Sequence, residues 1–101
     1  MFEWDEAKNR ANIAKHGVSF DVARRIFDGP VLNWLDGRRA YGEIRHVGIG
    51  RVDGVVFLAV VHTARNGNTR IISARPAKRK ERERYDQEKP DHKAIRPGTD
   101  A

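Results

Sequence analysis

The sequence predicts a small α+β domain. We expect an antiparallel sheet of four to five strands in the order β-α-α-β-β-β-β-α, with two N-terminal helices on one face and a basic C-terminal helix. Two observations support this. Apolar residues recur at helical spacing up to about Phe27 and at strand spacing from Val31 onward. Turn signals at Asp36-Gly37, Asp53-Gly54 and Asn66-Gly67-Asn68 then divide the second part into short segments, as in antiparallel sheets.

The N-terminal third is predicted to hold a short strand and two helices. Residues 2–4 form the strand, and Asp5 caps a helix that continues to about Lys15. The second helix starts after Ser19 and ends at Gly29-Pro30. The buried stripe of the first helix is expected on its apolar positions: Trp4, Ala7, Ala11 and Ala14.

Four strands and a basic helix are predicted for the remainder. The strands are expected at residues 31–35, 43–51, 55–63 and 69–74, and the third is apolar on both faces, which indicates a central strand. Pro76 suits the first turn of a helix over about 76–88. Residues 1–88 would form the single domain and 89–101 a flexible polar tail.

Composition limits the function classes. The chain has 101 residues, a net charge of +6 and no cysteine, which excludes disulfide scaffolds, cysteine zinc sites and thiol nucleophiles. The positive charge favours an anionic partner such as nucleic acid, although a highly charged surface alone would look the same. No apolar run approaches the ~20 residues that span a bilayer, and the start does not resemble a signal peptide. We therefore expect a cytoplasmic protein without a membrane partner.

The terminal helix carries the first candidate residues. Ala77, Glu81 and Tyr85 share its one plausible inward face, and a carboxylate there requires a cation such as Arg45 or Arg75. The outer face could meet phosphates, or could be a solvated face with ion pairs. Its basic residues are Lys78, Arg79, Arg82 and Arg84.

Several arginines near the last two strands suit phosphate chemistry. The planar fork of Arg45 fits phosphate oxygens, but a pair with Glu43 on the same strand face is the commoner outcome. Arg65, Arg70 and Arg75 would stabilise the charge of a pentacoordinate phosphorus, or would simply be arginines at the rim of the sheet.

The four histidines show no metal-ligand spacing, and no carboxylate set has the character of a magnesium site. We expect no metal and no other cofactor. His16, beside a helix C-terminus, is either a general acid or only a cap residue. His62 lies in an apolar strand and is expected to be a hydrogen-bonded core residue.

Short sequence motifs occur in a characteristic order along most of the chain. They are Phe2-Glu-Trp-Asp5, Asn12, Lys15-His-Gly-Val-Ser-Phe20, Ala23, Phe27, Gly42-Glu43-x-Arg45, and Arg70-Ile-Ile-Ser-Ala-Arg75-x-Ala77 with Glu81 and Tyr85. Together they resemble the BrnT family of toxins from type II toxin–antitoxin pairs, over about residues 1–88.

The resemblance implies a fold related to RelE-type ribonuclease toxins, metal-independent cleavage of RNA, and arrest of translation and growth. It also implies neutralisation by a BrnA-like ribbon-helix-helix antitoxin in a heterotetramer that contacts operator DNA only through the antitoxin. Two alternatives stay open. One is a non-catalytic basic module that binds RNA or DNA, and the other is a degenerate toxin that acts mainly as an antitoxin-binding co-repressor.

The expected reaction assigns roles to the basic and titratable residues. RNA can be cut by its own 2′-hydroxyl, so the protein need only orient the strand, move protons and stabilise charge. Arg45, Arg65 and Arg75 would stabilise the phosphorane, with Arg75 the strongest candidate. Proton transfer would fall to one of three residues, between which the sequence does not choose: His16, Glu81 and Tyr85. The RNA backbone would be held by Lys15, Arg70, Lys78, Arg79 and Arg82.

Overall fold

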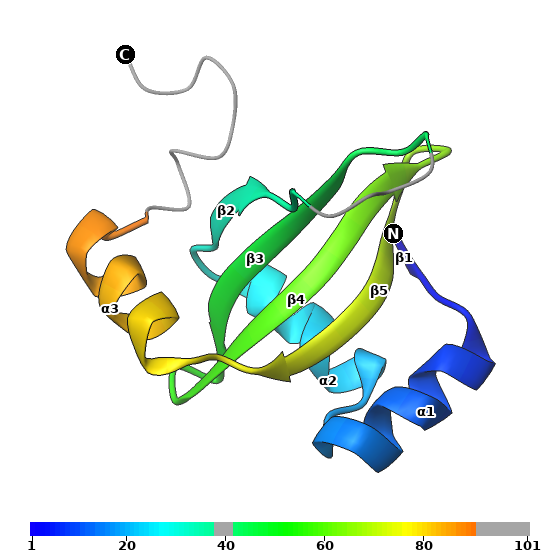
Figure 1. Ribbon diagram of the computed structural model, residues 1–101, viewed down its shortest axis with the longest axis horizontal. Helices are drawn as coiled ribbons and strands as arrows, with labels where there is room; N and C mark the ends of the chain where they lie inside the picture. Colours follow the sequence, from blue (N-terminus) through cyan, green and yellow to red (C-terminus); the bar gives the residue numbers. More distant parts are fainter. Residues whose placement is uncertain (38–41, 91–101) are drawn as a thin grey trace.

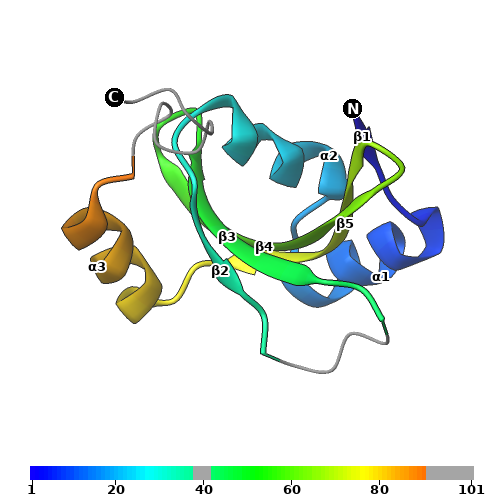
Figure 2. The ribbon, with the colours of Figure 1, turned by 90° about the horizontal axis from the view of Figure 1, so that it is seen from above.

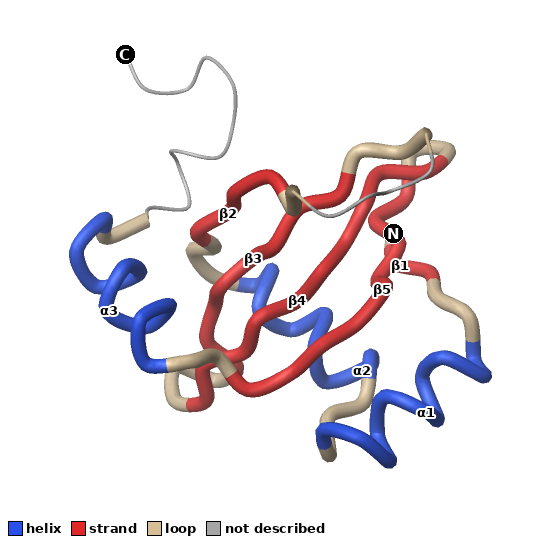
Figure 3. The backbone as a smooth tube through the Cα atoms, viewed as in Figure 1, coloured by secondary structure: helices blue, strands red, loops and turns tan. Residues whose placement is uncertain are grey.

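A computed structural model describes residues 1–37 and 42–90 of the chain. It shows a five-stranded sheet in the order β1-β5-β4-β3-β2, with three long strands side by side in the middle (Figures 1 and 3). The strands are β1 (Phe2–Glu3), β2 (Leu32–Leu35), β3 (Arg45–Val52), β4 (Val56–Arg65) and β5 (Asn68–Pro76). The helices are α1 (Glu6–His16), α2 (Phe20–Ala23), the 3-10 helix η1 (Arg24–Asp28) and α3 (Arg79–Glu88).

The prediction of a wholly antiparallel sheet is wrong at one edge. The neighbours from β2 to β5 pair antiparallel, but β1 pairs parallel with β5, with Phe2 opposite Thr69. The Thr69 N–H donates to the Met1 carbonyl over 2.8 Å. Tight turns fix the direction of the later strands, whereas α1, α2 and η1 separate β1 from the rest, so no turn determines how it docks.

Two apolar layers cover the two faces of the sheet. The larger one lies within the curve of the sheet, under α2 and η1 (Figure 2), and its fully buried side chains include Phe20, Ile26, Val60 and Ile71. The smaller layer lies on the outer face and includes Ile49 and Ala59. There α3 packs Ala77 and Tyr85 against the sheet, as predicted for its inward face.

Helix α1 does not bury its alanines. Ala7, Ala11 and Ala14 are exposed, and the buried residues of the helix are Asn9 and Asn12. The helix contacts the sheet chiefly through β5, at the edge left open where the two-residue β1 ends. Exposed backbone groups of an edge strand need polar partners, which explains why amides rather than methyl groups face inward here.

The predicted ends of α1 are confirmed: Asp5 accepts from the Lys8 N–H, and Gly17 is left-handed.

The terminal helix begins later than predicted. Pro76 is the last residue of β5, opposite Leu58, and the following Ala77 N–H donates to the Phe57 carbonyl over 3.0 Å. Lys78 is extended and its N–H donates to Glu81 Oε1 over 2.7 Å, which places the first helical residue at Arg79. A proline is tolerated at the end of β5 because the neighbouring β1 pairs only with Thr69 and Arg70, so no partner needs its missing N–H.

Gly50 is required by the contact between β3 and η1. A Cβ atom at this position would lie 2.8 Å from Ile26 Cβ, inside the fully packed layer. We expect Gly50→Ala to lower the free energy of unfolding by about 1–3 kcal/mol, because Ile26 is fully buried and has no room to shift. Gly29→Ala is the control, since nothing lies within 4 Å of its Cβ position. Equal urea midpoints for the two variants would contradict this packing.

His62 makes the stability of the fold depend on pH. Its Nε2 lies 2.9 Å from Asn33 Oδ1, its ring contacts Phe27 and His46, and burial together with His46 lowers its pKa to about 4. The unfolded chain takes up this proton near pH 6.5 and the folded chain only near pH 4. Protons are therefore released on folding within that window, and stability falls as the pH drops through it.

We expect this loss to reach at most about 3 kcal/mol between these pH values. The measurement is urea unfolding from pH 7 to pH 4, for wild type and for His62→Gln. Carboxylates with lowered pKa values also lose stability in acid, so the difference between the two proteins isolates the histidine. Parallel curves for the two proteins would show that His62 does not cause the dependence.

Candidate active site

A cleft of about 540 Å³ opens on the outer face of the sheet beside α3. Its floor consists of small side chains from the three long strands, namely Val47, Ala59, Val61 and Ser73. Charged or titratable side chains come from the end of α1, from β5, from the start of α3 and from the segment after β2; they are Lys15, His16, Asp36, Arg75, Lys78 and Glu81. Residues far apart in the sequence therefore meet at one hollow.

A β-bulge aims Arg75 into this cleft. The pairing between β4 and β5 shifts between Val61 and His62: His62 lies opposite Ile71, but Val61 lies opposite Ser73. Strict alternation from the buried Ile71 would place Arg75 on the covered face with it. The extra residue in the bulge reverses the face of the sheet to which the following side chains point. Ala74 therefore packs in the covered layer, and Arg75 faces the cleft.

Arg75 and Glu81 form a two-pronged ion pair at one end of the cleft. Arg75 Nη1 donates to Glu81 Oε1 and Nη2 donates to Oε2, both over 2.8 Å. The side chains are 31% and 15% exposed, so the pair is partly shielded from water. The predicted cationic partner of Glu81 is thus Arg75 and not Arg45, and the pairing holds the guanidinium in one orientation.

The Glu81 carboxylate is held in its charged form. The hydrogen bonds from Arg75, helped by the backbone N–H of Lys78, outweigh burial and lower the pKa of Glu81. A group with a lowered pKa does not donate a proton near neutral pH, and it accepts one only weakly. Glu81 is therefore better placed to orient Arg75 than to act as an acid.

Lys15 and His16 reach the cleft from the last turn of α1. The position of that turn is fixed by Asn12, whose amide bonds the backbone of Ala74, the neighbour of Arg75. Lys78 lines the cleft from the other side, at the start of α3. Of the predicted residues, the structure thus brings together Arg75, Glu81, His16, Lys15 and Lys78.

Arg45 and Arg65 lie elsewhere. Arg45 Nη2 is 2.8 Å from Glu43 Oε2 and Arg65 Nη2 is 2.7 Å from Glu43 Oε1, and these two arginines lower the pKa of Glu43. Arg45 is four residues along β3 from Ile49, which shares a register row with Ala59 and Arg75. Four strand residues span about 13 Å, and neither Arg45 nor Arg65 lines the cleft. The structure does not place Arg45 and Arg65 with Arg75.

Tyr85 is also outside the cleft. It is buried, its hydroxyl donates to the Pro30 carbonyl over 3.2 Å, and its ring meets Phe57 edge-on with centroids 5.2 Å apart. These contacts anchor α3 to the sheet, so the side chain has a structural part in this geometry.

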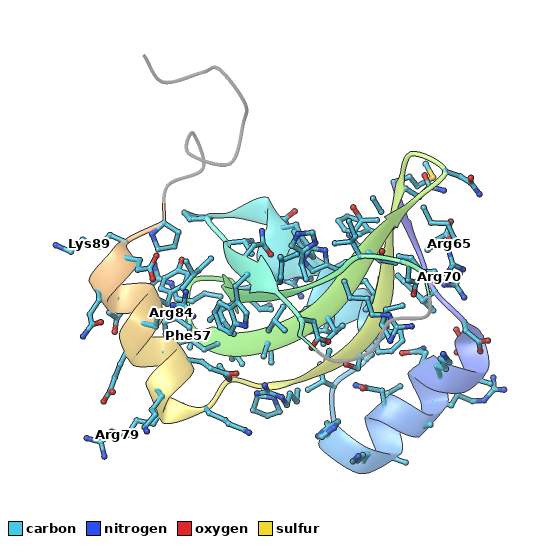
Figure 4. The ribbon with its side chains drawn as sticks, turned by 45° about the horizontal axis from the view of Figure 1, so that its top comes forward. Phe57, Arg65, Arg70, Arg79, Arg84 and Lys89 are labelled. Atoms are coloured by element: carbon cyan, nitrogen blue, oxygen red, sulfur yellow. The ribbon has the colours of Figure 1, made fainter. Side chains whose placement is uncertain are left out.

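The remaining predicted RNA contacts are dispersed. Arg70 pairs with Glu3 over 2.9 Å, and Figure 4 shows it with Arg65 near the end of the sheet away from α3. Arg79 pairs with Glu83 on the outer side of α3. Arg82 donates to the Ala77 carbonyl over 3.3 Å. None of the three lines the cleft.

Three polar or aromatic cleft residues were not among the predicted site residues, namely Trp34, Asp36 and Ser73. Trp34 is on the edge strand β2, and only the strand register brings it to the same face as Arg75. Within residues 1–37 and 42–90, no three His, Cys, Asp or Glu side chains gather as metal ligands. No helix in the same residues is long and apolar enough to cross a membrane.

Comparisons with known proteins agree with this fold. The sequence model of the family described as "Ribonuclease toxin, BrnT, of type II toxin-antitoxin system" matches residues 4–81. The crystal structure of the Brucella abortus ribonuclease toxin BrnT matches with a TM-score of 0.58 and 28% identity, over 78% of this chain and 99% of that one. The search of curated proteins gave no match. Because the family model covers most of the sequence, the chain belongs to the BrnT family of ribonuclease toxins of type II toxin–antitoxin systems.

Proposed function

We propose that this protein is a metal-independent endoribonuclease that cuts RNA in the cleft beside α3. The observation that carries the proposal is the oriented Arg75–Glu81 pair, in a hollow whose other cations are Lys15 and Lys78. Fixed positive charge in a partly shielded site is what a phosphorane dianion requires. The protein itself thus supplies the charge that a metal ion would otherwise bring.

The reaction follows from the substrate's own chemistry. The 2′-oxygen attacks the adjacent phosphorus, the bond from phosphorus to the 5′-oxygen breaks, and the products are a 2′,3′-cyclic phosphate and a 5′-hydroxyl. Arg75 stabilises the charge on phosphorus and the two lysines hold neighbouring phosphates. One proton leaves the 2′-hydroxyl and one is gained by the 5′-oxygen, and we assign this transfer to His16, because Tyr85 is outside the cleft and the pKa of Glu81 is lowered.

The test uses the purified chain, a synthetic single-stranded RNA and EDTA in excess over any divalent ion. We expect cleavage with cyclic phosphate ends, and no cleavage at a position that carries a single 2′-deoxy substitution. His16→Gln should slow the reaction. His46→Gln is the matched control, because His46 stacks on His62 away from the cleft. RNA that stays intact with the wild type, or an absolute need for added metal, would refute the proposal.

One observation favours the alternative of a binding module or degenerate toxin. Glu81 accepts from both terminal nitrogens of Arg75, so a phosphate would have to compete with a carboxylate for the same fork. If the pair only blocks the cleft, Glu81→Gln will raise RNA affinity, and binding will weaken steeply with salt without cleavage. If Glu81 orients Arg75 for catalysis, Glu81→Gln will lower the cleavage rate.

The biological setting is proposed with the activity. Cleavage of cellular RNA would arrest translation and growth, and a BrnA-like ribbon-helix-helix antitoxin would neutralise the toxin in a heterotetramer that reaches operator DNA through the antitoxin. We also propose a cytoplasmic location, a domain limited to residues 1–88, and kinship with RelE-type toxins. Membership of a type II toxin–antitoxin family supports a protein partner. Co-expression with the neighbouring gene product, followed by light scattering, would test the partner and its stoichiometry.

A further inference from the structure

The cleft has an aromatic end opposite its cationic end. Trp34 lies opposite Val47 on β3, which lies opposite Val61 and then Ser73 on β5. Trp34 therefore shares a register row with the strand segment that carries Arg75, three strand spacings away, or about 14 Å. The floor between them is apolar, formed by Val47, Ala59 and Val61. Phosphate is not stabilised by such a floor, whereas the flat face of a base is.

The Arg84 guanidinium stacks over the Trp34 ring. Its guanidinium carbon lies 4.6 Å from the ring centroid, and its Nε donates to Glu88 over 2.9 Å. Trp34 lines the cleft, whereas Arg84 does not. Figure 4 shows Arg84 on α3. A ring held in this way binds a base without losing rotamer freedom.

The indole N–H is also available. Among the residues that the structure describes, Trp34 makes no hydrogen bond through Nε1, although the ring lines the cleft. The other tryptophan differs, since Trp4 Nε1 donates to Glu6 over 3.3 Å and its ring packs on Phe20. Trp34 thus adds an apolar surface to the cleft, and its Nε1–H has no hydrogen-bond partner among the described residues.

We propose that Trp34 is a base-binding residue that holds an unpaired nucleobase next to the phosphate at Arg75. The inference rests on the proposed ribonuclease function and deepens it. A base within a duplex is stacked on its neighbours and cannot reach the ring, so the substrate is single-stranded RNA or a loop. Trp34 positions the strand and takes no part in the chemistry.

Fluorescence gives a direct test, because the chain has two tryptophans and Trp34 can be made the only one. Trp4→Phe protein is titrated with a 2′-O-methyl RNA that cannot be cut, and with an abasic strand of the same length. Binding of both strands is followed by anisotropy of a terminal dye. We expect the RNA to change the Trp34 emission at saturation and the abasic strand to bind about 5- to 150-fold more weakly, without that change.

Variants separate this inference from the proposed function. Trp34→Leu should weaken RNA binding by a similar factor and should leave binding of the abasic strand unchanged. Phe57→Leu is the matched control, because Phe57 packs in the same apolar layer but does not line the cleft. If the 2′-O-methyl RNA binds without a change in emission and no more tightly than the abasic strand, while unmodified RNA is still cut, the role of Trp34 alone is overturned. Failure to bind RNA at all would overturn both proposals.

Discussion

Arg75→Ala is expected to slow RNA cleavage by about 100- to 1,000-fold, the usual cost of losing one fixed donor to a charged transition state. The Arg75 guanidinium is a positive charge that the cleft holds in one orientation, because Glu81 binds it at two points. The loss should fall on the rate of the chemical step more than on RNA affinity, since Lys15 and Lys78 remain. Single-turnover cleavage of a defined RNA measures it.

Arg70→Ala is the matched control for that experiment. Arg70 is also on β5 and forms a 2.9 Å ion pair with Glu3, at side-chain exposures of 23% and 28%. Both substitutions remove the arginine from an ion pair and leave the carboxylate one other hydrogen bond, from Asn68 to Glu3 and from the Lys78 N–H to Glu81, so they should destabilise the fold to a similar degree. Cleavage by Arg70→Ala should fall no more than severalfold. An equal loss of activity in the two variants would mean that stability, and not the cleft, explains the Arg75 effect.

Local sequence patterns were sufficient to predict much of the framework. Asp5 and Ser19 cap their helices through the bonds that such residues ordinarily make, and Gly17 adopts the left-handed conformation at the end of α1. The inward face of α3 follows from four-residue spacing, since Tyr85 is buried and Glu81 nearly so. These features depend on residues that are neighbours along the chain.

Features that depend on pairing across the sheet were not predictable. The bulge opposite Val61 decides which way Arg75 points, and nothing in the residues after Ile71 marks it. The separation of Arg45 from Arg75 depends on the register of three strands, so a list of arginines could not show that they form two sites. Trp34 was overlooked for the same reason.

Asn12→Ala is expected to be the most destabilising substitution of a polar residue in this fold. Asn12 Nδ2 donates to the carbonyls of Val18 and Ala74, each over 2.8 Å, and Oδ1 accepts from the Ala74 N–H over 3.1 Å. The side-chain amide thus bonds Ala74 as a neighbouring strand would, on the stretch of β5 that β1 does not reach. Alanine would leave three buried backbone groups unpaired.

Asn12→Ala should lower the free energy of unfolding by about 3–5 kcal/mol, because each unpaired group costs ~1–3 kcal/mol and water partly compensates. The total free energy of unfolding of a domain is about 5–15 kcal/mol. Urea unfolding followed by circular dichroism measures it. Asn9→Ala is the control: Asn9 is buried on the same helix, but only its bond from the Phe20 N–H ties α1 to another element. Similar midpoints for the two variants would show that the edge of β5 does not need Asn12. If it does, the residual folded protein should also cleave RNA slowly, because α1 carries Lys15 and His16 into the cleft.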